Sequence, residues 1–445
     1  MNKQRHHIIQ FVCILTVLVA VMLQGFTKVV KMKPLKGFTQ EEKPVALDFK
    51  TYWDGTYQGY LTEHAKLNTG FREFFIRNYN QVCYSCFNKI TNKNIVKGYH
   101  QELYLKMYLD EVTGKRLEQT YHDVESAKAA ARDNVESTLA LIDTLRKHGT
   151  EFLFVFAPSK TAIYPEMMPK EYQKQILDFS LEEYYIELFK ESNIPHIDLY
   201  HHFQDLKGTF PYPLYPRTGT HWSEATIPFV ADTILKKLES LTGYDLPSVL
   251  YLEDNLTTDY SVQDGELEAS MNLLFPLDKP ALPRPVFTLT ETVNADKPNL
   301  LVISDSYFTQ LLISPFVEAF NHWDCWFYNR DTRSSRPFYD GKHMNMFFDA
   351  AEIVEDADIV MAIFTAPMYY TYMFDFTNTA QELLQKGIMD DQEAIQVIIN
   401  NILDTPEWLE AVEKQAEELG LTTEENIYRN AEYVLRMNKL KKEQQ

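Results

Sequence analysis

The chain has 445 residues, of which 45% are hydrophobic, enough for one large hydrophobic core or two ordinary ones. Its formal net charge is -20, so it carries no excess of basic side chains with which to neutralise a phosphate backbone. We therefore expect no nucleic acid partner. Aromatic residues make up 13% of the chain, which is compatible with a tyrosine-rich core and also with surfaces that stack on sugar rings.

The N-terminal segment 8–25 is almost wholly apolar and long enough to span a bilayer. Residues 22–26, at the end of this segment, contain no Ala-x-Ala cleavage motif, which favours an uncleaved anchor over a cleaved signal. Lysines on both sides of the segment leave the positive-inside rule undecided. We assign residues 1–33 to a single membrane anchor or uncleaved signal. We expect the main domain outside the cytoplasm, on the periplasmic or cell-surface side.

Four cysteines are present, and two of them, Cys83 and Cys86, have the spacing of a redox pair. They follow a helix-like segment instead of a strand, and no second pair completes a zinc site. We interpret them as structural or incidental. The sequence predicts neither a metal site nor a cofactor.

Residues 34–120 are predicted to form a linker and an N-terminal substructure. Apolar spacing over 57–80 predicts helices that are broken at Thr69-Gly70, and two short strands around a turn are predicted within 94–105. These elements precede the main sheet.

Residues 121–376 alternate between helical and strand patterns, which predicts a parallel, doubly wound α/β sheet. An acidic and proline-rich stretch near 250–290 is interpreted as an insertion, and residues 377–445 as a helical extension. The predicted helices are 123–148, about 177–192, and one that His221 opens and Gly243 ends; the predicted strands are 152–156, 195–199, 300–303, 326–329 and 359–364.

The buried strand at 300–303 ends in Ser304-Asp305-Ser306. Open α/β sheets place their reactive groups at this carboxyl end, so Ser306 is the candidate nucleophile. A serine hydroxyl needs a base, and the best candidate is His221, in Gly219-Thr220-His221-Trp222-Ser223. The same residues are also compatible with a plain strand-to-helix cap and a helix-start histidine.

The block 157–166, which contains Lys160, is followed by the His221 block and then the Ser306 block. In this order the three resemble the SGNH-hydrolase-like acyltransferases of the alginate O-acetylation type and the related DHHW proteins, over roughly 49–364. The resemblance implies a circularly permuted, flavodoxin-like, three-layer α/β/α sandwich. It further implies that Ser306 is acylated, that His221 moves the proton, and that an acetyl group passes to a polysaccharide hydroxyl. A membrane-bound O-acyltransferase partner would supply the acyl group.

One position departs from the family pattern, because Gly219 stands where an aspartate is expected two residues before the histidine. The loss of a triad aspartate costs orders of magnitude in rate. Another carboxylate, such as Asp198, replaces it, or a Ser-His dyad suffices, or the domain is a non-catalytic polysaccharide-binding or assembly component. A carbohydrate acetyl esterase that uses the same residues is the alternative enzyme.

The remaining candidates are assigned to the oxyanion or the substrate. Backbone N–H groups at the start of the following helix, including that of Ser306, would stabilise the oxyanion. Ser304 is a further candidate for the oxyanion or the substrate. Lys160 binds an anionic group or caps a carbonyl. The residues that line a sugar groove, or in the case of the aromatic pair pack in the core, are Arg217, Trp222, Tyr328 and Asn329.

Overall fold

The computed structural model describes residues 3–37, 44–294, 296–337, 339–341, 350–387 and 390–442, so the first two residues of the predicted anchor lie outside it. The chain forms two compact units. One contains Met1–Lys106, Arg217–Thr220 and Gly265–Pro280, and the other contains Met107–Pro216, His221–Asp264 and Ala281–Gln445. The candidate nucleophile and base both belong to the second unit.

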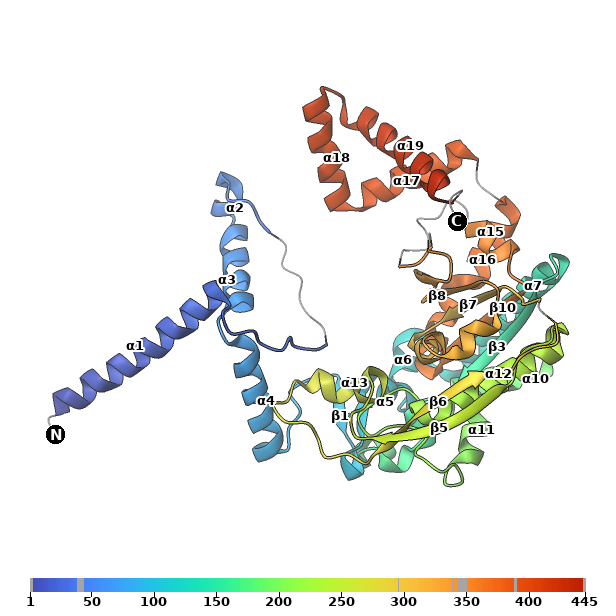
Figure 1. Cartoon of the computed structure of the whole chain (residues 1–445), viewed down its shortest axis with the longest axis horizontal. Helices are drawn as coiled ribbons and strands as arrows, with labels where there is room; N and C mark the ends of the chain where they lie inside the picture. Colours follow the sequence, from blue (N-terminus) through green and yellow to red (C-terminus); the bar gives the residue numbers. More distant parts are fainter. Residues whose placement is uncertain are drawn as a thin grey trace. The chain divides into compact units, whose positions relative to one another are not determined.

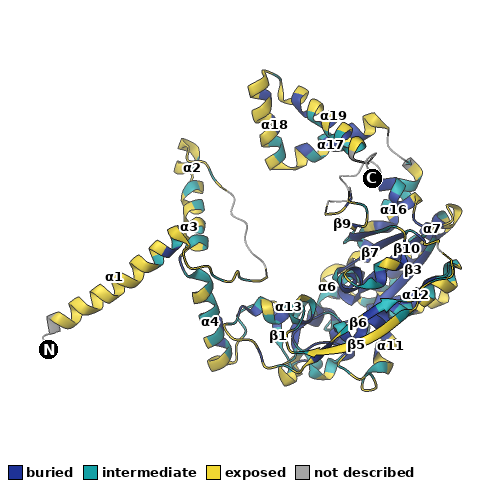
Figure 2. Cartoon of the chain, viewed as in Figure 1, coloured by how far each residue is buried: buried dark blue, intermediate teal, exposed yellow. Residues whose placement is uncertain are grey.

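The first unit begins with α1 (Lys3–Thr27), a helix whose segment Arg5–Thr27 is long and apolar enough to cross a membrane. Most of its apolar residues are exposed, and Figure 2 colours the helix accordingly. Near its end α1 approaches the chain around Gly70 so closely that a Cβ at Gly70 would overlap the carbonyl oxygen of Val21. This contact requires glycine.

The other elements of the first unit follow the predicted pattern. The chain breaks between α3 and α4 at the expected Thr69-Gly70, and β1 and β2 pair as an antiparallel hairpin, so both predictions are confirmed. Cys83 and Cys86 lie in α4, and all four cysteines of the chain are unpaired. The elements are α2 (Phe49–Trp53), α3 (Thr56–Asn68), α4 (Arg72–Phe87), β1 (Ile95–Lys97), η1 (Tyr99–Gln101) and β2 (Leu103–Leu105).

The second unit is built on a six-stranded sheet of order β4-β3-β10-β7-β8-β9 (Figure 1). All neighbours are parallel except β8 and β9, so the predicted parallel sheet is confirmed with one antiparallel edge strand. Every residue of β7 and β10 is buried, as expected for strands covered on both faces. The strands are β3 (Glu151–Ala157), β4 (His196–Asp198), β7 (Leu300–Ser304), β8 (Trp323–Phe327), β9 (Asp331–Ser334) and β10 (Ile359–Thr365).

Helices cover both faces of this sheet and make a three-layer sandwich. One face presents Phe154, Ile303 and Phe364 to a core that includes α7 (Val124–Lys147), α10 (Leu181–Glu191), α15 (Ala350–Glu355) and α16 (Phe376–Lys386). The other face contacts α11 (Leu199–Leu206) and α12 (Ile227–Thr242). Shorter segments join them: α5 (Lys106–Val112), α6 (Lys115–Tyr121), α8 (Lys160–Ile163), η2 (Pro165–Met167), α9 (Lys170–Gln173), η5 (Pro315–Ala319) and η7 (Ala366–Asp375).

Two local predictions are wrong. His221 does not open a helix: the short helix η3 (Glu224–Thr226) begins later, and α12 starts where Pro228 falls in its first turn, the place that tolerates proline. Strand β8 ends at Phe327, because the next two residues adopt left-handed backbone. The predicted insertion contains regular structure, the antiparallel pair β5 (Val249–Thr257) and β6 (Leu282–Leu289), with α13 (Val262–Met271) between them.

The predicted helical extension is confirmed. Helices α17 (Asp391–Asp404), α18 (Pro406–Leu419) and α19 (Thr423–Lys442) pack on one another through their own apolar cluster. An aspartate N-cap with a capping box starts α17, and a proline in the first turn starts α18.

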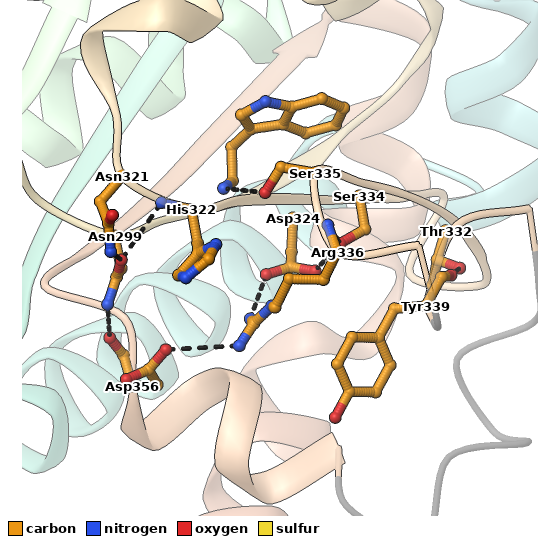
Figure 3. Close-up of polar contacts among 11 residues, drawn as sticks. Asn299, Asn321, His322, Asp324, Thr332, Ser334, Ser335, Arg336, Tyr339 and Asp356 are labelled. Carbon is orange, nitrogen blue, oxygen red and sulfur yellow. Dashed lines mark hydrogen bonds and ion pairs between the residues drawn. The ribbon is translucent and has the colours of Figure 1, made fainter. Parts of the chain in front are cut away.

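A polar clamp of Asn299, Asp324, Ser334, Arg336 and Asp356 joins the amino ends of β7 and β8 to β9 and to the end of α15 (Figure 3). The Asp324 carboxylate is 4% exposed and accepts from the Ser334 hydroxyl at 2.6 Å and from the Arg336 guanidinium. Arg336 also pairs with Asp356 at 3.3 Å. The guanidinium therefore balances a buried charge.

We expect Arg336→Ala to lower the free energy of unfolding by about 3 kcal/mol, because it leaves the Asp324 carboxylate buried without its cation. The matched control is Arg333→Ala, whose pair with Asp340 is 53% and 40% exposed, and which should cost at most about 1 kcal/mol. Urea denaturation measures both. Equal losses in the two variants would show that the buried ion pair contributes no more to stability than the exposed one.

Candidate functional site

Strand β7 carries Ser306 to the carboxyl edge of the sheet. The chain leaves the strand at Ser304, turns at Asp305 with extended backbone, and enters the short helix η4 (Ser306–Phe308), which continues directly into α14 (Thr309–Leu312). The Asp305 carboxylate caps this turn by accepting from the Tyr307 backbone N–H at 2.9 Å. Ser306 therefore stands at the first residue of a helix that starts beside the central strands.

His221 reaches Ser306 across 85 residues of sequence. Its Nε2 atom lies 2.9 Å from the Ser306 hydroxyl oxygen, and its ring packs on Tyr307 with centroids 4.9 Å apart. The loop that carries it is closed by Ser223, whose backbone N–H donates to the Leu214 carbonyl and whose hydroxyl donates to Pro213, both at 2.8 Å. A serine hydroxyl that donates to a neutral imidazole is the arrangement from which a base activates a nucleophile.

Asp305 is a candidate that the sequence reasoning did not assign a role. Its carboxylate is buried and accepts from the backbone N–H and the hydroxyl of Thr365, each at 2.9 Å, as well as from Tyr307. Burial raises its pKa, whereas these donors and the nearby His221 oppose the rise. Every contact is one in which the carboxylate accepts, which suits the ionised form. Asp305 thus places negative charge near His221. An aspartate at position 219 would supply such a charge, but Gly219 has no side chain to do so.

Tyr328 also faces Ser306. Burial raises the pKa of its phenol, and hydrogen bonding with the Ser306 hydroxyl and with the Ser306 backbone N–H opposes that rise. Tyr328 and Asn329 have φ values of 55° and 49°, an uncommon conformation for tyrosine, and the Tyr328 N–H donates to the Ser304 carbonyl at 2.8 Å. This turn folds the end of β8 over the end of β7. The Tyr328 phenol oxygen thereby lies beside the hydroxyl and the backbone N–H of the candidate nucleophile.

We expect Tyr328→Phe to lower acetyl-ester turnover by about 10²-fold, the usual cost of removing one oxyanion donor. The ring contact with Phe374, centroids 5.2 Å apart, stays in this variant, so thermal stability should change little. The exposed Tyr433→Phe is the control. If Tyr328→Phe turned over the ester at the wild-type rate, the phenol would not be an oxyanion donor.

The other predicted site residues lie in varied settings. Lys160 is buried at the start of α8, and its Nζ donates to the Pro216 carbonyl at 2.7 Å, as in the carbonyl-capping alternative. Arg217 belongs to the first unit, where its Nε lies 3.9 Å from the Glu102 carboxylate. Asn329 donates to the Phe374 carbonyl and the Thr379 hydroxyl, both at 3.0 Å, so its amide N–H bonds hold the turn.

Two of the predicted site residues, Trp222 and Ser304, have fully buried side chains. Trp222 packs edge-on against Tyr307 with centroids 5.1 Å apart, so it belongs to the core and not to a sugar groove. The Ser304 hydroxyl lies inside the sheet, 3.3 Å from the Cys325 sulfur, and does not line a substrate site.

Asp198 is not the substitute for the missing aspartate. It ends β4, which is three strand positions away from β7, or about 14 Å at the usual strand spacing. Its carboxylate caps α11 through the His201 N–H and also contacts the His201 ring at 2.8 Å and Lys190 at 2.9 Å. The Asp198 carboxylate is therefore occupied at the start of α11.

A cavity of about 420 Å³ has Glu111 and Glu182, both buried, among its lining residues. Burial raises the pKa of Glu111 from 4.5 to about 7, with the Arg116 guanidinium opposing the rise. Burial first, and then the charge of Glu111, raise the pKa of Glu182 well above its usual range. Both groups are therefore held in a setting that favours the protonated form.

This setting makes stability depend on pH. Because the folded-state pKa of Glu111 exceeds the unfolded value, the stabilisation is complete below about pH 4.5 and is lost as the pH rises through about 7. The loss is about 3 kcal/mol for such a shift. We expect Glu111→Gln to flatten the dependence, measured as the free energy of unfolding from pH 5 to 8. Exposed Glu118→Gln is the control, and an unchanged pH slope in Glu111→Gln would contradict the assignment.

Comparisons with known proteins point to one domain type. Residues 117–301 match the family model described as the SGNH hydrolase-like domain of the acetyltransferase AlgX, a match that includes His221 and ends before Ser306. No curated protein sequence matches the chain. The family match and the observed sheet confirm the predicted resemblance and the SGNH-like α/β fold.

Three solved structures are similar at low identity. The O-acetyltransferase domain of Pseudomonas putida AlgJ is 16% identical, with 64% of this chain and 99% of that chain covered and a TM-score of 0.39. Pseudomonas aeruginosa AlgX is 13% identical, with coverages of 64% and 67% and a TM-score of 0.41. A DHHW family protein from Eubacterium siraeum is 14% identical, with coverages of 54% and 88% and a TM-score of 0.31.

Proposed function

We propose that this chain, whose residues 117–301 match the SGNH hydrolase-like domain of the acetyltransferase AlgX, is an O-acetyltransferase that acts on a hydroxyl of a cell-surface or secreted polysaccharide. The observation that carries the proposal is the 2.9 Å contact between the His221 Nε2 atom and the Ser306 hydroxyl at the carboxyl edge of the sheet. The helix α1 supports a location at a membrane. We further propose that the main domain lies outside the cytoplasm.

The first half-reaction forms an acetyl-enzyme. The Ser306 oxygen attacks the carbonyl carbon of the acetyl donor while its proton passes to His221 Nε2. The Ser306 backbone N–H and the Tyr328 phenol stabilise the oxyanion, and Asp305 stabilises the imidazolium. The bond to the leaving group then breaks, and His221 returns the proton to that group. In the cell we propose that a membrane-bound O-acyltransferase delivers the donor.

The second half-reaction transfers the acetyl group. A sugar hydroxyl gives its proton to His221 and attacks the acetyl carbonyl carbon, after which the ester bond to Ser306 breaks and His221 reprotonates the serine oxygen. Transfer in place of hydrolysis requires that the acceptor hydroxyl displaces water from the acetyl-enzyme. The acceptor must therefore bind next to Ser306.

The test is incubation of the purified protein with 4-nitrophenyl acetate and a mixture of neutral and acidic oligosaccharides. Mass spectrometry of the protein and of the sugars, together with an assay of free acetate, follows the acetyl group. We expect acetylation of Ser306 and a gain of acetyl groups on sugars. Free acetate with no acetylated sugar would instead assign an esterase. The absence of both a protein adduct and ester turnover would favour the non-catalytic binding module.

A further inference from the structure

Glu111 is a buried carboxyl group that no neighbouring donor satisfies. The residue is 8% exposed, and neither of its carboxyl oxygens accepts a hydrogen bond from the residues that the structure describes. Both oxygens keep some accessible surface, and the residue lines the cavity of about 420 Å³, so this surface faces the cavity. Buried polar groups are normally paired, and an unpaired carboxylate costs more than an unpaired neutral group. A carboxyl group retained in this setting indicates a ligand.

The local structure around Glu111 does not stabilise a negative charge. Glu111 is the last residue but one of α5, and the C-terminal end of a helix carries partial negative charge. The Arg116 guanidinium, whose charge opposes the rise in the pKa of Glu111, stacks on the Tyr370 ring at 5.3 Å from its centroid. The helix itself therefore gives no reason for a carboxyl group at this position.

Further carboxyl groups reach the same cavity from the start of α10. Glu182 is 1% exposed, and one of its oxygens accepts from the Tyr369 hydroxyl at 3.5 Å, whereas the other accepts from no described residue. Burial first, and then the charge of Glu111, raise the pKa of Glu182, so the two carboxyl groups interact. Glu183 and the exposed Asp178 also line the cavity. The cavity thus gathers acids from two separate helices.

The cavity has no basic lining residue to balance these acids. Its lining residues all fall within the described range 44–294, and none of them is lysine, arginine or histidine. Ile176 and Leu177 at its edge are 42% and 37% exposed, so the cavity opens to solvent on that side. Other apolar lining residues are Val112, Met168 and Phe179. This lining suits a cation that carries a short apolar stem.

We propose that this cavity binds the primary ammonium group of a small organic molecule. An ammonium group has three N–H donors and can donate to the free oxygens of Glu111 and Glu182, while the apolar stem packs on Ile176 and Leu177. In the described ranges no three acidic, histidine or cysteine side chains are placed to share a metal ion, which favours the organic cation. The inference goes beyond the proposed function and holds whether or not Ser306 is acetylated.

Binding should depend on pH, because a cation favours ionised carboxyl groups. Burial raises the pKa of Glu111 to about 7, with Arg116 opposing, and Asp198 and Glu183 add to the rise in the pKa of Glu182. The ligand should therefore bind more tightly as the pH rises through about 7 and should displace a proton below that pH. We expect about fourfold tighter binding at pH 8 than at pH 6.5 from Glu111 alone.

The experiment is isothermal titration calorimetry of the purified protein with n-butylammonium chloride, and with 1-butanol as the neutral analogue, at matched ionic strength. We expect saturable binding of the ammonium probe only. Glu111→Gln keeps the shape but removes the charge, so the affinity should fall at least about tenfold and lose its pH dependence. Glu182→Gln should also weaken binding. Exposed Glu118→Gln is the control and should bind as wild type does, with folding of each variant checked by circular dichroism.

Equal binding of the two probes, no saturable binding of the ammonium probe, or wild-type affinity in both Glu111→Gln and Glu182→Gln would overturn the proposal. Displacement of the ammonium probe by an equal concentration of calcium chloride would assign the cavity to a metal ion and would also overturn it. The outcome is separate from that of the proposed function, because Ser306→Ala protein should bind the ammonium probe with wild-type affinity.

Discussion

Ser306→Ala is expected to lower the turnover of 4-nitrophenyl acetate by roughly 10⁴- to 10⁶-fold, because nucleophile and base act as a unit in such sites. The alanine methyl group cannot form the acetyl ester, so intact mass should show no adduct at this position. His221→Ala should lose a similar factor, since the serine proton then has no acceptor at the observed 2.9 Å. The double variant should be hardly worse than either single one.

The controls for these variants are Ser240→Ala and His148→Ala, both on exposed surfaces of helix ends in the second unit. They should react as wild type does. Turnover that survives both Ser306→Ala and His221→Ala would mean that another nucleophile carries the reaction. An adduct that persists in Ser306→Ala, mapped by peptide mass, would identify that nucleophile directly.

Asp305→Asn is expected to lower turnover by about 10²- to 10⁴-fold, by analogy with the loss of charge from a triad aspartate. The Asp305 carboxylate faces three donors and interacts with His221, so the neutral amide no longer stabilises the imidazolium. In this variant the NH₂ group of the new asparagine faces a backbone N–H that donated to the carboxylate. Two donors then face each other, which should cost about 1–3 kcal/mol of stability. Steady-state kinetics and thermal unfolding are measured together.

Thr365→Val separates the charge of Asp305 from its structural role. It removes the hydroxyl that donates to Asp305 at 2.9 Å but leaves the carboxylate in place. We expect a loss of stability of about 1–2 kcal/mol and less than a tenfold loss of turnover. If Thr365→Val and Asp305→Asn lost turnover equally, Asp305 would serve only to hold the turn.

Much of the architecture could be predicted because the strands of a parallel sheet are buried on both faces. Segments such as 152–156 and 359–364 therefore appear as continuous apolar runs, and helix 123–148 shows a clear helical period with a glycine after it. Boundaries were less accurate where a neighbouring element decides the backbone. The left-handed turn at Tyr328 is held by its bond to the Ser304 carbonyl, a residue of another strand, so no local pattern marks it.

The sequence alone determined the strand that carries Ser306 and the polar residues that follow it, because a strand and its carboxyl end are contiguous in the chain. Only the tertiary structure decided which side chains gather there. His221 and Tyr328 approach Ser306 from other segments, whereas Trp222, next to His221 in sequence, turns into the core. Side-chain burial and partners depend on how distant segments pack. For this reason a serine and a histidine could be selected from their local patterns, but the contacts of Asp305 could not.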